Sequence, residues 1–351
     1  MLLYIHIPFC DSKCHYCAFN SYVDKFHLKQ EYMSALYNQI SYELKRFEVQ
    51  EKSLKSIFLG GGTPSCVESN LYEKIFTLLK PYINNKTEIT TEANPNSASK
   101  KWLSEMYKLG VNRVSFGVQS FDDDKLKMLN RAHNATQAIN AIKNAHDIGI
   151  QNISLDIIYA TINDSKELLQ KDLNIAFSLP INHLSAYALT IEEKTPFEHK
   201  PQMANEKLEL TKWLFNEIEQ HNFKQYEISN FGTYQSIHNK GYWLYDDYIG
   251  AGSGAVGKLK NKRFYPSTDI QTYINNPLHV KEELLNDEDT KLEKIFLGFR
   301  SCVGVEENIL SKEELKRALT LTKEKKLTKR ENKFYNENYL LADELALFLT
   351  S

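Results

Sequence analysis

The segment Tyr4-Ile-His-Ile-Pro-Phe-Cys-Asp-Ser-Lys-Cys-His-Tyr-Cys-Ala-Phe-Asn20 decides the fold of this chain, and it contains Cys10, Cys14 and Cys17. An alternating apolar run at its start predicts a short strand, which Pro8 prevents from continuing. Three thiols then follow within eight residues, so they can turn towards one object. Thiolates select soft metals or an iron–sulfur cluster. Three protein ligands for four irons would leave one iron open to a small molecule.

Two other chemistries are open to these cysteines. A structural zinc ion takes four ligands, and His15 or His6 could supply the fourth. Disulfide pairing is the weaker alternative, because three clustered thiols cannot pair evenly and nothing indicates an oxidising compartment. We favour the iron–sulfur cluster. The isolated Cys66 and Cys302 are expected to be small buried apolar residues.

Length and composition exclude several classes of protein. A chain of 351 residues has room for one large domain and a smaller one. Its 43 basic and 45 acidic side chains give a net charge of −2, so there is no electrostatic case for a nucleic-acid partner. No apolar run approaches the roughly 20 residues of a membrane span, and the N-terminus lacks a signal peptide. We therefore expect a cytoplasmic protein.

Strand and helix patterns alternate six times before residue 222. We expect strands at residues 3–7, 53–59, 87–93, 113–118, 152–158 and 183–189. We expect helices at residues 28–44, 68–80, 97–109, 136–147 and 167–177, two of which end at Gly110 and Gly149. Alternation with short loops predicts parallel strands and an α/β fold, and six units predict an incomplete (β/α)6 barrel. Strand patterns disappear after Asn261, and helices are expected at residues 292–300, 312–318 and 338–349. The predicted domains are therefore residues 1–257, the partial barrel, and 258–351, a small and mainly helical domain.

Polar residues fall where these strands end. The cysteine loop follows the first strand, Gly60-Gly61-Gly62 follows the second, and Glu92, Gln119 and Asp156 lie near the ends of the next three. Active residues of parallel sheets gather at this edge. The glycines allow a ligand to approach backbone N–H groups, although a plain tight turn has the same composition. Glu92 suits ribose hydroxyls or an ammonium group, and a buried Asp156 needs a partner or a ligand. Arg131 could hold a carboxylate, unless it is a surface arginine.

The Cys-x3-Cys-x2-Cys spacing, with Tyr16 before the third cysteine, resembles the signature of the radical S-adenosylmethionine (radical SAM) superfamily. More specifically, the chain is similar to the oxygen-independent coproporphyrinogen III oxidase family over nearly its whole length. The motifs that carry this resemblance are Tyr4-Ile-His-Ile-Pro-Phe-Cys, Gly60-Gly-Gly-Thr-Pro-Ser, Glu92-Ala-Asn-Pro, Phe116-Gly-Val-Gln-Ser-Phe, Asn130-Arg-Ala-His and Leu155-Asp-Ile-Ile-Tyr. The resemblance implies a [4Fe–4S] cluster on the three cysteines. It also implies one or two SAM sites, formed by Tyr4, Tyr16, Gly61, Gly62, Thr63, Glu92, Gln119, Arg131 and Asp156.

Departures from the family decide the branch. The oxidases carry a fourth cysteine where this chain has Phe19, and they have an additional segment before the position of Tyr4. Both differences resemble the HemW branch, the radical SAM heme chaperones. The run His238-Asn-Lys-Gly-Tyr-Trp243 resembles the His-Asn-x-x-Tyr-Trp motif of that branch. One difference from the family is Ala160-Thr-Ile, where the usual sequence is Gly-Leu-Pro.

The same run supplies the candidate heme residues His238, Asn239, Tyr242 and Trp243. Imidazole is a common ligand of heme iron, and the aromatic side chains offer flat surfaces for a porphyrin. The alternative is that His238 and Asn239 hydrogen-bond a loop while Trp243 packs in the core. The resemblance supports the run as a feature of the branch and leaves both roles open.

The resemblance to the chaperone branch implies a protein that keeps the cluster and SAM, binds heme and passes it to acceptor hemoproteins. The alternative is a coproporphyrinogen III oxidase, in which a radical derived from SAM attacks a porphyrinogen propionate. SAM cleavage is compatible with both. The expected partners are heme or a porphyrin, acceptor hemoproteins and an electron donor such as a flavodoxin or ferredoxin, with no nucleic acid. A homodimer and an encounter with a membrane surface are compatible with this reading.

Overall fold

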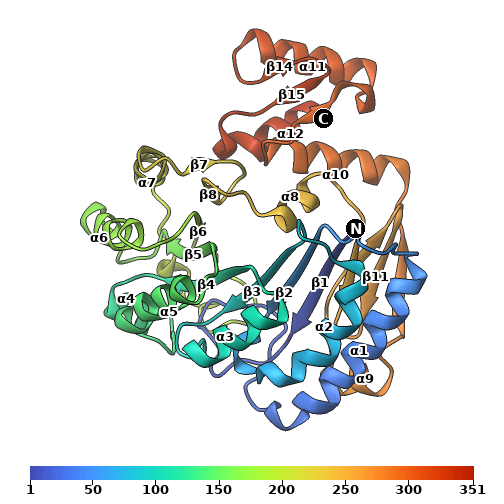
Figure 1. Cartoon of the computed structure of the whole chain (residues 1–351). Coiled ribbons are helices and arrows are strands. Elements are labelled where there is room, and N and C mark those ends of the chain that lie inside the picture. Colours follow the sequence, from blue (N-terminus) through green and yellow to red (C-terminus); the bar gives the residue numbers. More distant parts are fainter.

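The computed structural model describes residues 1–351 and contains one twelve-stranded sheet, with the strand order β12-β11-β10-β9-β1-β2-β3-β4-β5-β6-β8-β7. The strands from β9 to β6 in this order run parallel. They are β1 (Leu2–Ile7), β2 (Ser56–Gly61), β3 (Glu88–Ala93), β4 (Arg113–Gln119), β5 (Asn152–Tyr159), β6 (His183–Ala188) and β9 (Tyr248–Ala251). The two edge strands do not pair with each other, so the predicted incomplete barrel is confirmed (Figure 1).

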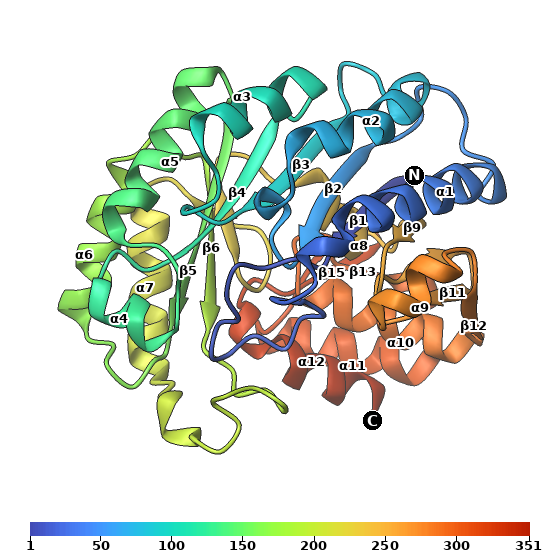
Figure 2. The same cartoon turned by 90° about the horizontal axis from the view of Figure 1, so that it is seen from below.

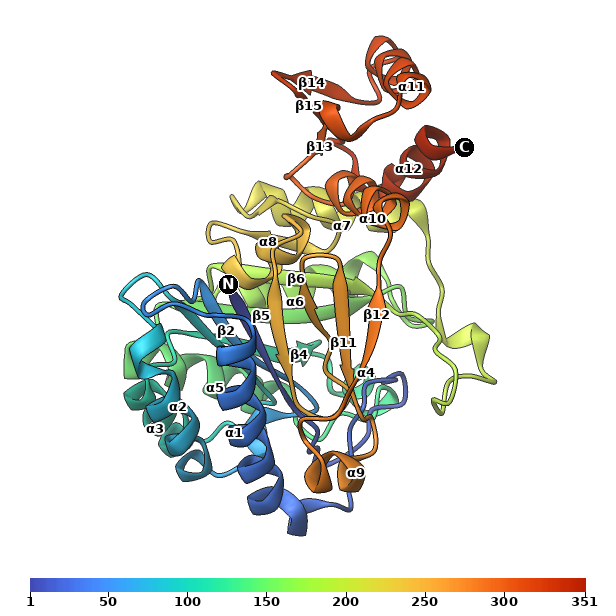
Figure 3. The same ribbon diagram turned by 90° about the vertical axis from the view of Figure 1, so that its right-hand side faces the viewer.

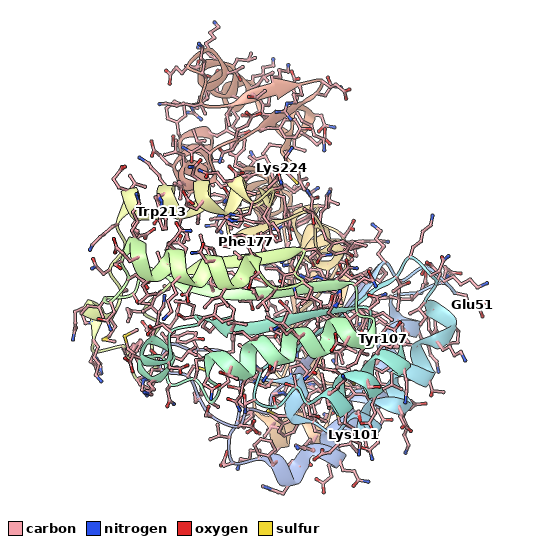
Figure 4. All side chains as sticks on the ribbon, turned by 60° about the vertical axis from the view of Figure 1, so that its left-hand side comes forward. Glu51, Lys101, Tyr107, Phe177, Trp213 and Lys224 are labelled. Atoms are coloured by element: carbon pink, nitrogen blue, oxygen red, sulfur yellow. The ribbon has the colours of Figure 1, made fainter.

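Helices follow the parallel strands along the chain and cover the outer face of the sheet (Figure 2). They are α1 (Lys29–Arg46), α2 (Glu73–Leu79), α3 (Lys100–Leu109), α4 (Asp123–Met128), α5 (Ala135–Ile148), α6 (Lys166–Phe177) and α7 (Leu208–Gln220). Figure 4 looks onto this outer face, where Tyr107 of α3, Phe177 of α6 and Trp213 of α7 are labelled. The five predicted helices are confirmed, and α4 and α7 were not predicted. Short 3-10 helices add η1 (Phe26–Leu28), η2 (Pro64–Cys66), η3 (Ser69–Tyr72), η4 (Lys80–Tyr82), η5 (Pro201–Met203), η6 (Glu307–Ile309) and η7 (Tyr339–Leu341).

Local chemistry sets the ends of these helices. The Ser99 hydroxyl caps α3 by accepting a hydrogen bond from a backbone N–H, and Asn134 forms a capping box at the start of α5. Both helices end at a glycine, Gly110 with φ of 111° and Gly149 with φ of 109°. These left-handed residues complete the last turn, as the sequence predicted.

The inward face of the sheet is polar. Successive strand residues point to opposite faces. On β4, Val114 and Phe116 belong to the main hydrophobic core beneath the helices, whereas Arg113 and Ser115 line the interior of the barrel. The same alternation places a polar set inside on three neighbouring strands: Glu88, Thr90, Glu92, Ser154, Asp156, His183 and Ser185. The outer face therefore carries the hydrophobic stabilisation, and the interior is left for polar chemistry.

Helix α8 (Ile237–Trp243) lies at the amino ends of the central strands. Glu88, the first residue of β3, is 2% exposed, and its carboxylate accepts hydrogen bonds from the backbone N–H groups of Ile237 (2.9 Å) and His238 (3.0 Å). The hydroxyl of Tyr234 donates to the same carboxylate at 2.8 Å. A negative charge at the start of a helix is favourable. Glu88 thus fixes α8 across this end of the barrel.

The predicted domain boundary at residue 257 falls inside a strand. Three antiparallel strands, β10 (Gly257–Leu259), β11 (Lys262–Pro266) and β12 (Val280–Leu284), continue the main sheet beyond β9, and α9 (Ile270–Asn275) contacts α1. On the other edge, β8 (Asn230–Gly232) and β7 (Lys224–Gln225) follow β6. The expectation of no strands after Asn261 is therefore wrong, and the barrel domain extends to about residue 285.

The remaining residues form a small domain with its own core of ten buried side chains, from Ile295 to Leu349. It contains α10 (Asp287–Phe299), α11 (Lys312–Lys323) and α12 (Ala342–Thr350), which confirm the three predicted helices. A three-stranded sheet of β13 (Val305–Glu306), β15 (Lys333–Tyr335) and β14 (Thr328–Arg330) completes it. Figure 3 shows this domain beyond α8, on the side of the barrel away from α9. None of the helices has the length and apolar character needed to cross a bilayer.

A buried ion pair fixes the chain after β5. Lys125 of α4 lies 2.6 Å from Asp164, and both side chains are 1% exposed. Asp164 also accepts a hydrogen bond from the backbone N–H of Thr161 at 2.8 Å. This contact holds the segment that departs from the family sequence, in which Ala160 adopts a φ of 60°.

Replacing Lys125 with Met should lower the free energy of unfolding by about 3–5 kcal/mol, because Asp164 would keep a buried charge without a partner. Lys127→Met is the matched control on the same helix, since the Lys127–Asp124 pair is exposed and such pairs contribute little. Urea unfolding followed by circular dichroism measures both variants. Equal unfolding midpoints for the two would contradict the prediction.

Candidate functional site

A cavity of about 620 Å³ opens at the carboxyl ends of the parallel strands, and we call it the upper cavity. Its wall contains the three candidate cluster cysteines and every SAM candidate from the sequence except Tyr4. These are Cys10, Cys14, Tyr16, Cys17, Gly61, Gly62, Thr63, Glu92, Gln119, Arg131 and Asp156. The cysteines and Tyr16 come from the loop after β1, and most of the others come from the ends of β2 to β5. The polar positions that the sequence places at separate strand ends therefore meet at one cavity.

The cysteine loop is closed at its base by two backbone hydrogen bonds, from Cys10 N to Tyr22 O (3.1 Å) and from Tyr22 N to Pro8 O (2.7 Å). Cys10 and Cys14 are each 8% exposed, at the wall of the upper cavity. No three His, Cys, Asp or Glu side chains are arranged to hold a single metal ion. In a four-iron cluster each thiolate ligates a different iron, so the sulfurs need not converge on one point. The donor set therefore fits a cluster better than a zinc ion.

The two histidines considered as a fourth zinc ligand lie outside the upper cavity. The Nδ1 atom of His6 is hydrogen-bonded to the hydroxyl of Tyr4 (3.0 Å), and its Nε2 atom to the carbonyl oxygen of Asn20 (2.8 Å). The Nδ1 atom of His15 is hydrogen-bonded to the carbonyl oxygen of Met128 at 3.1 Å. Neither imidazole is placed to complete a zinc site with the cysteines.

The glycine turn brings β2 against the cysteine loop. A Cβ atom on Gly62 would lie 2.9 Å from the carbonyl oxygens of both Ile7 and Phe9, which are backbone atoms with no room to move aside. Gly61 has a φ of 111°, and its N–H donates to the Glu92 carboxylate at 3.1 Å. Glycine is thus required here for close packing of two backbones. That requirement holds independently of any ligand.

Arg131 reaches the cysteine loop. Its Nη1 atom lies 3.0 Å from the sulfur of Cys14, and its Nη2 atom donates to the Asn94 side-chain oxygen at 2.6 Å. Asn94 in turn donates to the hydroxyl of Thr63 (3.1 Å), which lies 3.3 Å from the sulfur of Cys10. The Nε atom of Arg131 has no partner. Arg131 lines the upper cavity next to the thiols, where its guanidinium can bind an anionic group.

Two carboxyl groups face the cavity from adjacent parts of the sheet. Burial raises the pKa of Glu92 to about 7, and repulsion from Asp156 acts in the same direction. Burial also raises the pKa of Asp156, against the opposing effects of Ser185, Arg113 and Ser115. A ligand that brings an ammonium group or hydroxyl donors would favour ionisation of both.

Several residues of the cavity wall carried no assigned role in the sequence. They are Asn94, Ser115, Gly117 and Tyr187. Strand alternation could have found them, because Ser115 and Gly117 occupy the polar face of β4 between buried apolar residues. Phe19 also lines the cavity and is 69% exposed.

A second, smaller cavity of about 230 Å³ lies deeper in the barrel, and we call it the lower cavity. It shares Glu92, Ser115, Asp156 and Tyr187 with the upper cavity. Its wall includes the remaining SAM candidate, Tyr4, and three of the heme candidates, His238, Asn239 and Tyr242. Trp243 lines neither cavity.

His238 is 1% exposed, and both nitrogens of its ring are engaged. Nδ1 is hydrogen-bonded to the hydroxyl of Ser56 (2.8 Å), and Nε2 to the hydroxyl of Tyr242 (2.9 Å). The adjoining cavity is also smaller than the roughly 300–1,000 Å³ of ordinary ligand pockets. In this conformation the geometry favours the interior structural role for His238, and the assignment of a heme ligand stays a prediction.

Comparisons of the sequence and of the fold with known proteins agree on one family. Residues 4–174 match the Radical SAM superfamily. The chain is 34% identical over 322 residues to the heme chaperone HemW of Bacillus subtilis, covering 86% of this chain and 84% of that protein. It is 37% identical over 285 residues to HemW of Haemophilus influenzae, covering 77% and 72%. The solved structure of coproporphyrinogen III oxidase HemN from Escherichia coli matches with a TM-score of 0.83 over 99% of this chain and 89% of that one. Its sequence identity of 19% makes this a likeness of fold alone.

The pKa of Glu92 predicts a pH-dependent stability. Between about pH 4.5 and 7, folded Glu92 keeps a proton that the unfolded chain releases, so the free energy of unfolding should fall as the pH rises. Glu92→Gln cannot titrate, and its stability relative to the wild type should rise by up to about 1.4 kcal/mol per pH unit in this window. Urea unfolding at a series of pH values measures the difference, with exposed Glu51→Gln as the control. Parallel pH profiles for the wild type and Glu92→Gln would rule the prediction out.

Proposed function

Because the chain belongs to the HemW family of radical SAM proteins, we propose that it is a heme chaperone that holds a [4Fe–4S] cluster and SAM and delivers heme to acceptor hemoproteins. The observation that carries this proposal is the 34% identity to a HemW protein over 84% of that protein's length. The similarity covers 86% of this chain, so it is not confined to the residues that match the radical SAM superfamily. The meeting of three cysteines at one cavity with the polar strand ends supports the same reading.

The upper cavity is the proposed place for both cofactors. Cys10, Cys14 and Cys17 would hold the cluster, which together with SAM supplies one-electron chemistry when bound. The backbone of the glycine turn can approach the ligand closely, and Glu92 can accept hydrogen bonds from an ammonium group or from ribose hydroxyls. Arg131 can pair with a carboxylate next to the cysteine loop.

The oxidase alternative has less support. The oxidases carry a fourth cysteine in this motif, and this chain has Phe19 at that position. The likeness to HemN concerns the fold, which can host different functions. We also propose that the protein receives electrons from a donor such as a flavodoxin or ferredoxin. We further propose that it acts in the cytoplasm.

Purified protein with a reconstituted cluster should bind heme and show a Soret band, and it should not decarboxylate coproporphyrinogen III anaerobically with SAM and a reductant. The reason is that a carrier needs the cofactor sites but not the oxidase chemistry. Absorption spectroscopy and product analysis measure the two activities on one preparation. Decarboxylation at a catalytic rate, or the absence of heme binding, would overturn the proposal.

The position of His238 makes a separate prediction. We expect His238→Ala to retain the Soret band and heme affinity within about threefold, since its imidazole lies inside the barrel with both nitrogens hydrogen-bonded. The same variant should unfold at a lower urea concentration, because Ser56 and Tyr242 would lose their buried partner. Heme titration and urea unfolding measure the two effects. A lost Soret band in a variant with unchanged stability would show instead that α8 opens and His238 ligates the iron.

A further inference from the structure

Arg113 is a buried cation with no carboxylate in contact, although its charge lowers the pKa of the Glu92 and Asp156 carboxyls at longer range. It is the first residue of β4, it is 2% exposed, and it takes part in no ion pair. Its Nη1 atom lies 3.5 Å from the hydroxyl of Thr90, the outer limit of a hydrogen bond, and its Nε atom has no partner. A guanidinium stays charged at every relevant pH, and burying a charge without a partner is costly. The guanidinium is therefore free to take an anionic partner at contact distance.

The side chain of Arg113 lines the lower cavity, whose volume is about 230 Å³. Asn239 of α8 lines the same cavity, and its side-chain amide makes no hydrogen bond. The N–H groups of the guanidinium and the NH₂ group of the amide can both donate hydrogen bonds to one acceptor group. The space suits a ligand of a few non-hydrogen atoms.

Strand register separates the charges of this cavity along the barrel. Arg113 pairs with Thr90, whereas Glu92 pairs with Ser115, so the backbone of Arg113 lies about two residues, roughly 7 Å, closer to α8. Asp156 lies two residues beyond Ser154, which also pairs with Ser115, and is therefore farther still from Arg113. The acidic end of the lower cavity adjoins the upper cavity, and its basic end lies against α8.

The other groups near Arg113 cannot serve as its partner. The oxygens of the Glu88 carboxylate already accept hydrogen bonds from α8 and from Tyr234. His183 is hydrogen-bonded through both ring nitrogens, to Ser154 and to Tyr226, each at 2.7 Å. Burial and the Arg113 charge lower the pKa of His183, and they lower that of His238 to about 3, so both imidazoles are neutral.

We propose that the lower cavity is a binding site for a carboxylate, held by the guanidinium of Arg113 and the amide of Asn239 beneath the ligand of the upper cavity. A planar guanidinium matches the two oxygens of a carboxylate, which gives the site its specificity for this class of anion. The carboxylate belongs either to a small free acid or to an acidic arm of a larger molecule that enters through the shared wall. The site is distinct from the cysteine loop.

Calorimetric titration of the cluster-loaded protein with acetate tests the first source, and acetamide serves as the neutral isostere. Acetate should bind at one site, acetamide should not, and Arg113→Gln should weaken acetate binding at least tenfold. Asn239→Asp is a second variant, which places a negative charge against the ligand and should weaken binding similarly. Arg330→Gln, at an exposed arginine, should bind like the wild type.

Heme titration of the same variants tests the second source, and this arm rests on the proposed function. If acetate does not bind but Arg113→Gln and Asn239→Asp each lower heme affinity at least tenfold, the carboxylate is a propionate arm. If acetate binding is lost in both variants, the free acid is the ligand, whether or not the protein carries heme. The proposal is overturned if acetamide binds as tightly as acetate does, or if the two variants bind both acetate and heme as the wild type does.

Discussion

The carboxylate of Glu88 joins the start of β3 to the first N–H groups of α8, and the polar interior of the barrel depends on that junction. Parallel strands leave the end of a barrel open unless another element covers it, and here α8 does so. Its contact with the strands is close, since a side chain at Gly241 would collide with Leu2. The hydrogen bond between His238 and Ser56 adds a second tie, to β2. The His-Asn-x-x-Tyr-Trp run thus has a structural reason to exist in addition to any role in binding.

The strands carry buried hydrophobic side chains on their outward face and the polar side chains of the two cavities on their inward face. The outward side chains of β1 to β6 join the helices in one large core, which supplies the stability that a polar interior cannot. Inside, ionisable side chains such as Arg113, Glu92 and Asp156 line two adjoining cavities instead of filling the barrel. In closed barrels the same positions carry branched apolar residues packed in layers. The open edge and the closing helix allow this chain to keep space there.

The sequence predicts the parallel strands and the cysteine loop well, because both have strong local patterns. It does not predict β12, whose Lys281, Glu282 and Glu283 are exposed at the edge of the sheet and give no hydrophobic alternation. The sequence also does not predict how far along the barrel axis a residue lies. Tyr4 shares the inward face with the SAM candidates, but its register with Phe58 places it at the lower cavity. Alternation along one strand tells which face of the sheet a side chain lies on. Its position along the barrel axis depends on the register between neighbouring strands, which the sequence of one strand does not contain.

The backbone contact at Gly62 restricts how iron can reach the three cysteines. The N–H of Gly62 donates to the carbonyl oxygen of Ile7 at 2.8 Å, and the base of the cysteine loop is closed again between Tyr22 and Pro8. The loop therefore cannot swing open as a unit about its two ends without disturbing β2. The middle of the loop is held as well, since the N–H of His15 donates to the carbonyl oxygen of Leu129 at 3.2 Å and the carbonyl oxygen of His15 accepts from the N–H of Phe197 at 3.1 Å. Iron would therefore have to reach the three cysteines through the upper cavity, whose wall they share with the exposed Phe19, and not by an opening of the loop.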